Sequence, residues 1–162
     1  MKLKREFIHK LPKTDLHVHL DGSLRMSTIF DLAKIQNVKL PADNEAELKA
    51  MIACADNCES LNQYLKAFDI TLSVMQTEEA LYRVAYELAE DCAAENIRYM
   101  EVRYSPVLHT KNGLKLTQIS DAVIAGLRDA EKKLNIKTGV IICGIRNMSP
   151  LTSLKLAELA VA

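Results

Sequence analysis

The sequence has little that points to a membrane, a nucleic acid or an oxidising compartment. Its 21 basic and 21 acidic residues cancel, so no charge excess indicates a nucleic acid or an anionic membrane surface as partner. No apolar run approaches the roughly 18 residues of a membrane span, and residues 1–7 lack the apolar core of a signal peptide. The scattered cysteines therefore predict reduced thiols in a cytoplasmic protein. They are Cys54, Cys58, Cys92 and Cys143.

The chain also lacks a short-period repeat, a low-complexity segment and an obvious linker. Its 162 residues, 49% of them apolar, suffice for one domain with a hydrophobic core. We therefore expect residues 1–162 to belong to a single domain.

Segments of strand character alternate with amphipathic helical segments along the chain. We expect strands over residues 14–20, 97–104 and 138–145. We expect helices over residues 24–36, 45–53 and 59–75, and further helices that start at Thr77, at Thr117 and at Ser149–Pro150. This βα alternation predicts a parallel sheet covered by helices.

The first two strands each combine an apolar face with a polar face, because residues two apart in a strand share a side. The polar set of the first strand is Asp15, His17, His19 and Asp21, and that of the second is Tyr99, Glu101, Arg103 and Ser105. Strands of an open doubly wound sheet have two apolar faces, whereas a closed barrel has an inner face that opens into the active site. The pattern favours the first three βα units of a (β/α)8 barrel, which takes about 250 residues and is incomplete in this chain.

Two imidazoles on one strand face, His17 and His19, indicate a metal site. Neutral imidazole is a good zinc ligand, and catalytic zinc usually has about three protein ligands and a water molecule. His9 lies at the opposite end of the strand, and His109, which follows the second strand, is a weak candidate for a further ligand. Gly22, where the backbone turns, favours the metal interpretation. The alternative is a pair of buried, hydrogen-bonded core histidines.

At this point two motifs resemble a known family. The segment Leu11–Ser23, LPKTDLHVHLDGS, closely resembles the opening motif of the adenosine deaminases, and Glu101–Pro106, EVRYSP, resembles their second-strand motif. Residues 60–69 resemble the helix that covers their substrate pocket, and the resemblance runs from about His9 to the chain end. It implies a (β/α)8 barrel with one Zn²⁺ at its carboxyl-terminal rim that deaminates adenosine or deoxyadenosine to inosine or deoxyinosine.

The resemblance also implies roles for individual residues. His17 and His19 would be zinc ligands, and Asp21 would bond the ribose 5′-hydroxyl. The implied substrate-binding residues are His19, Asp21, Ser105 near the pocket, and an apolar lid of Leu61, Tyr64, Leu65 and Phe68. The family's other ligands and its glutamate proton shuttle come from later strands, so we expect no general acid or base here. The remaining strands must come from further sequence or from another chain.

Three functions stay open on the sequence. The first is a zinc-dependent deaminase of purine nucleosides to which this chain contributes part of the site. The second is an adenine deaminase or another barrel hydrolase of the same superfamily, although members acting on free adenine tend to carry glutamate where Asp21 stands. The third is a non-catalytic metal-binding or assembly module. Glu101 and Arg103 are interpreted as one polar network inside the barrel, and Arg146 has no assigned role.

Overall fold

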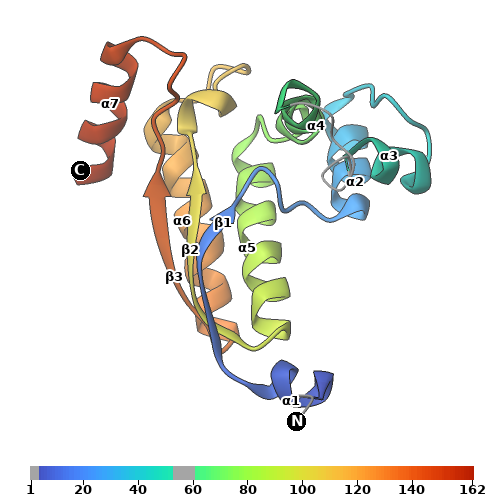
Figure 1. The fold of residues 1–162 in the computed structure, drawn as a ribbon. Coiled ribbons are helices and arrows are strands. Elements are labelled where there is room, and N and C mark those ends of the chain that lie inside the picture. The colour runs from blue at the N-terminus through green and yellow to red at the C-terminus, as the bar shows by residue number, and fades with distance from the viewer. Residues whose placement is uncertain (1–3, 53–60) are drawn as a thin grey trace.

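The computed structural model describes residues 4–52 and 61–162 (Figure 1). Its strands β1 (Lys13–His19), β2 (Ile97–Tyr104) and β3 (Lys137–Ile142) form one parallel sheet in the order β1-β2-β3. The three predicted strands are thus confirmed, but the third ends three residues early. Cys143 still donates its N–H to the Tyr104 carbonyl at 2.9 Å, and the chain then turns away from the sheet.

The helices lie on one face of the sheet and at its two ends (Figure 1). They are α1 (Arg5–Lys10), α2 (Met26–Gln36), α3 (Glu45–Ile52), α4 (Leu61–Ser73), α5 (Glu78–Ala94), the 3₁₀ helix η2 (Pro106–His109), α6 (Leu116–Lys133) and α7 (Pro150–Val161). Helices α5 and α6 cover the sheet, and α1 lies at the amino ends of the strands. Among the described residues, none of the helices has the length and apolar character needed to cross a membrane.

At two of the three predicted positions, a hydroxyl side chain caps the first turn of the helix. Thr77 accepts from the Ala80 N–H at 3.2 Å, and Ser149 accepts from the Thr152 N–H at 3.4 Å. The prediction of Thr117 as a cap is wrong, because α6 already begins at Leu116. There the Gln118 side chain accepts from the Lys115 N–H at 3.0 Å, and this bond replaces the hydroxyl cap.

The core lies between the sheet and helices α5 and α6. Met100 and Val102 of β2 are fully buried, and they pack against apolar stripes of both helices. The two helices approach so closely that a Cβ on Gly126 would lie 2.3 Å from the Tyr82 carbonyl oxygen. The stripes predicted from helical spacing are buried at Leu81, Val84, Ala85, Leu88, Cys92, Val123, Leu127 and Ala130. The predicted stripe also included Leu134, which is only partly buried and follows the last residue of α6.

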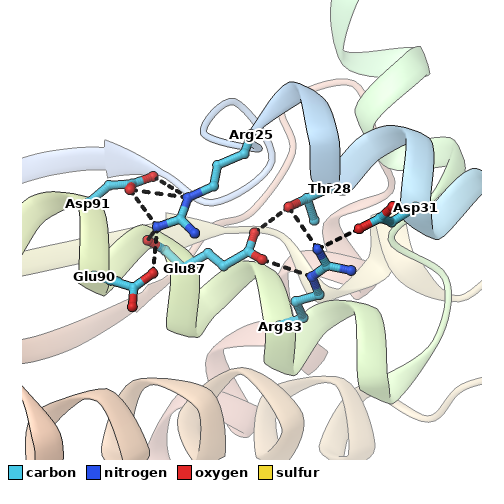
Figure 2. A network of polar contacts seen from close by, with 7 residues as sticks. All are labelled: Arg25, Thr28, Asp31, Arg83, Glu87, Glu90 and Asp91. Atoms are coloured by element: carbon cyan, nitrogen blue, oxygen red, sulfur yellow. Dashed lines mark hydrogen bonds and ion pairs between the residues drawn. The ribbon is translucent and has the colours of Figure 1, made fainter.

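Two arginines tie α2 to α5, as Figure 2 shows. Arg25 contacts Asp91 at 2.6 Å and Glu90 at 2.7 Å. Arg83 contacts Glu87 at 2.8 Å and Asp31 at 2.9 Å, and Thr28 on α2 donates to the same Glu87. Because Arg25 directly precedes α2, the loop between β1 and α2 is held at both of its ends.

Strand β1 contains a β-bulge that the residue pattern does not reveal. Asp15 pairs with Met100 and Val18 pairs with Val102, so two residues of β1 oppose one residue of β2. Asp15 therefore lies on the helix-covered side, and its carboxylate is, after burial, the next largest influence that raises the pKa of Cys92 on α5 to about 11. The prediction that Asp15 shares a face with the two histidines is wrong.

Candidate metal and substrate site

The two histidines of β1 lie on the face of the sheet that no described helix covers. His17 is exposed, the His19 side chain is 50% exposed, and their ring centroids are 5.4 Å apart. The alternative interpretation as buried core histidines is therefore wrong. The exposed imidazoles lie close together and remain available to a ligand.

The separation of the rings fits one shared zinc ion. Two imidazoles that bind a tetrahedral zinc at about 2.0–2.1 Å place their ring centroids about 5 Å apart, close to the observed 5.4 Å. Within residues 4–52 and 61–162, no group of three or more histidine, cysteine, aspartate or glutamate side chains could hold a metal. His17 and His19 thus fit half of a zinc site.

Asp21 follows β1 and is buried beside the histidine pair. Its side chain is only 9% exposed, and its Oδ1 lies 3.8 Å from His19 Nδ1. This buried oxygen has no hydrogen-bond partner within the described part of the chain. Burial raises the pKa of Asp21 above its usual value, against the opposing effects of a backbone hydrogen bond and of His19. A buried acceptor without a partner is costly, so it is well suited to a hydroxyl donor of a ligand.

Helix α4, the predicted lid, lies against the turn that follows β1. A Cβ placed on Gly22 would lie 3.4 Å from the ring of Phe68, in ordinary van der Waals contact, so the Phe68 ring lies directly beside this turn. Leu65 is 49% exposed. The side chains of Leu61 and Tyr64 lie outside the described residues. The described part of the predicted lid thus combines one ring at the turn with one exposed apolar side chain.

Ser105 and Arg103 make backbone contacts between strands. Ser105 is buried and donates to the Cys143 carbonyl at 2.7 Å. Arg103 donates through Nη2 to the Leu16 carbonyl at 3.0 Å, whereas Glu101 accepts from the Tyr99 hydroxyl at 3.0 Å. The interpretation of Glu101 and Arg103 as one network is therefore wrong, since each bonds a different partner. The contact of Arg103 with β1 carries no signal in the sequence.

His109 does not reach the rim. It is fully buried, and its Nδ1 lies 2.9 Å from the Met75 carbonyl oxygen. Burial lowers the pKa of His109 to about 4 despite this hydrogen bond, so the ring is neutral near pH 7. Gln76 adds a second link by donating to the Leu108 carbonyl at 3.0 Å. His109 and Gln76 therefore fasten η2 to the end of α4, a role that sequence reasoning missed.

Comparison with known proteins decides the family. The family model described as adenosine deaminase matches residues 12–162. The chain belongs to the adenosine deaminase family. An adenosine deaminase of Clostridium botulinum is 50% identical over 139 residues, which cover 86% of this chain and 42% of that protein. A probable adenosine deaminase of Dictyostelium discoideum is 47% identical over 154 residues, 95% of this chain and 20% of that protein. The chain thus spans less than half the length of these curated members of the adenosine deaminase family.

Solved structures agree with the assignment to the adenosine deaminase family. An adenine deaminase from Arthrobacter aurescens matches with a TM-score of 0.82 and 26% identity, over 93% of this chain and 45% of that one. An amidohydrolase from Burkholderia ambifaria, solved with bound Zn, matches with a TM-score of 0.80 and 25% identity, over 98% of this chain and 43% of that one. These neighbours confirm the expected fold class, three βα units of a (β/α)8 barrel.

Proposed function

We propose that residues 1–162 supply two zinc ligands and part of the nucleoside pocket of a zinc-dependent adenosine deaminase. The observation that carries the proposal is the pair His17 and His19, 5.4 Å apart on the uncovered face of β1, beside the buried carboxylate of Asp21. The names of the curated relatives support the reaction. The zinc ion of the Burkholderia neighbour supports the metal.

Each residue has a distinct task in this proposal. His17 and His19 would each hold the zinc through one ring nitrogen. When bound, zinc lowers the pKa of a water ligand to about 7 and so supplies hydroxide at neutral pH. Asp21 would accept a hydrogen bond from a ribose hydroxyl, and the apolar face of α4 would cover the base. Deamination also needs a general acid for the purine ring, which we expect from residues outside this chain.

A second candidate is deamination of free adenine, the activity in the name of the Arthrobacter neighbour. The buried, unpartnered Oδ1 of Asp21 favours the nucleoside, because a ribose hydroxyl can donate to it and adenine brings no hydroxyl. A comparison of kcat/KM for adenosine, deoxyadenosine and adenine separates the two candidates. We expect both nucleosides to be preferred.

The test uses the complete gene product that contains residues 1–162. We expect one zinc ion per chain by atomic absorption and conversion of adenosine to inosine by chromatography. A folded protein with neither zinc nor turnover would contradict the proposal and support the assembly module. If the gene product ends at residue 162, the assay is repeated with an added polypeptide that carries the remaining barrel strands, and restored turnover is the expected result.

A further inference from the structure

We propose that Arg103 and Asp15 are positioning residues for His17. Both side chains hold the peptide unit between Leu16 and His17, at the bulge of β1. The inference rests on the proposed function in one respect, that His17 and His19 bind zinc. It adds two residues that do not themselves touch the metal.

The bulge leaves backbone groups that need new partners. Leu16 and His17 together oppose the single residue Glu101, so one of them cannot join the regular ladder. The carbonyl of Leu16 accepts from Arg103 Nη2 at 3.0 Å. The N–H of His17 donates to Asp15 Oδ1 at 3.0 Å. Two side chains therefore satisfy the backbone at the bulge, as polar main-chain groups require.

These two backbone groups belong to the same peptide unit. The unit is planar and trans, so its C=O and N–H point in opposite directions. Arg103 extends from the face that carries the histidines, and Asp15 lies on the helix-covered side. The two hydrogen bonds hold opposite edges of one plane and fix the position of this peptide unit at the bulge.

A shift of this peptide unit would move His17. The Cα of His17 is bonded to the nitrogen of the unit, so the position of the unit at the bulge sets where the His17 side chain leaves the strand. Bulges next to active sites commonly re-aim a side chain in this way. The held plane thus fixes the approach of the His17 ring to His19, at the observed 5.4 Å between centroids.

The position of Arg103 suits this task. Its Cα is the register partner of His19, so Arg103 lies beside one histidine and reaches back along β1 to the peptide unit of the other. Its Nε is buried and has no hydrogen-bond partner in the described part of the chain. Glu101, on the same face of the strand, accepts from the Tyr99 hydroxyl instead. Within residues 4–52 and 61–162, the guanidinium of Arg103 therefore has its hydrogen bond with the Leu16 carbonyl.

The test measures zinc affinity of the complete gene product by competition with a chromophoric chelator. We expect Arg103→Met and Asp15→Ala each to weaken zinc binding by about 10–100-fold, as loss of groups that orient metal ligands does. Asp15→Asn keeps the Oδ1 acceptor, so its affinity should stay within about threefold of the wild type. Arg103→Lys keeps one donor and should fall between. The absorption spectrum of the Co²⁺-substituted proteins should change in the same order.

Arg98→Met is the matched control. Arg98 also lies on β2 and also donates to a backbone carbonyl, that of Asn135 at 2.9 Å, but at the end of the strand away from the bulge. Its loss should leave zinc affinity unchanged.

The outcomes separate this inference from the proposed function. If wild type binds zinc and folded Arg103→Met and Asp15→Ala bind it equally tightly, the positioning role is overturned while the proposed function stands. If Asp15→Asn loses as much affinity as Asp15→Ala, the hydrogen-bond role of Asp15 is overturned. If Arg103→Met does not fold, the Asp15 pair decides alone. A wild-type protein that binds no zinc overturns both proposals.

Discussion

The two faces of the sheet hold their side chains by different means. On the helix-covered face, Met100 and Val102 are fully buried among apolar neighbours from α5 and α6. On the uncovered face, His17 and His19 are exposed, and Arg103 makes one directed contact with a backbone carbonyl. Close packing distributes stability over many contacts, whereas directed hydrogen bonds set the geometry of single groups. We infer that the helix-covered face contributes most of the stability, and that the uncovered face provides the groups proposed to bind metal and substrate.

The largest effect on the chemistry of the uncovered face is expected from a substitution of His17. In His17→Ala, we expect the complete gene product to lose its bound zinc and its turnover to background, because one of the proposed ligands is removed. Folding should persist, since His17 lies outside the apolar core between the sheet and helices α5 and α6. Atomic absorption, inosine formation and circular dichroism check the three statements.

His9 provides a control for His17 at the opposite end of β1. It is also exposed and lies on α1. His9→Ala should keep zinc and turnover. Full zinc occupancy and full turnover in His17→Ala would reject its assignment as a ligand.

The next largest effect is expected on the opposite face of the sheet. Met100→Ala should lower the free energy of unfolding by about 2–5 kcal/mol, the usual cost of a cavity in a packed core. The neighbouring variant Tyr99→Phe removes only the hydrogen bond to Glu101 on the uncovered face and should lower the free energy of unfolding much less than Met100→Ala does. Urea titrations of both variants provide the measurement. Equal costs would contradict the proposed division between the two faces.

The helix-covered face could be predicted from the sequence because its signal is local and periodic. Helical spacing identifies the buried positions of α5 and α6, such as Leu81 and Leu127. Strand alternation identifies Met100 and Val102 in the same way. Each of these predictions needs only neighbours within one element, and burial of apolar surface then reinforces the same choice.

The uncovered face was predicted only in part, because long-range contacts modify the local pattern. Alternation around His17 and His19 resembles a regular strand, yet the bulge moves Asp15 to the other side. The group that holds the bulge, Arg103, is 87 residues away from Leu16. His109 likewise owes its place to the Met75 carbonyl, 34 residues earlier. No pattern within a single segment encodes such pairs.

His109, which links η2 to the end of α4, should make the stability of the folded chain depend on pH. Its pKa falls from 6.5 to about 4 in the folded chain because of burial. As pH decreases through this window, the unfolded chain binds a proton that the folded chain does not, so stability falls. Between about pH 7 and pH 5 the loss from this residue should be about 2 kcal/mol.

The variant His109→Gln separates this effect from other titrating groups. It retains a side-chain donor but does not titrate, so its free energy of unfolding should fall less steeply over the same pH window. Urea titrations at several pH values compare it with the wild type. Identical pH dependence in the two proteins would contradict a buried, neutral His109.

Asp21 sharpens the distinction between metal binding and substrate binding on the uncovered face. Asp21→Ala should raise KM for adenosine about 10–100-fold, since a hydrogen bond to a charged group contributes about 1.5–3 kcal/mol. Zinc content should stay at the wild-type level. Loss of zinc together with binding would instead show that Asp21 is a ligand or supports one.

The smallest effect on stability is expected at Arg25, whose ion pairs link the start of α2 to α5. Its side chain is 34% exposed, and its partners Glu90 and Asp91 are 43% and 52% exposed. Exposed ion pairs contribute about 0.2–1 kcal/mol, so Arg25→Met should lower the free energy of unfolding by less than about 1 kcal/mol. Because Arg25 also holds the end of the loop that carries Asp21, KM for adenosine should rise more than the small loss of stability explains. An unchanged KM would show that β1 and Phe68 alone hold this loop.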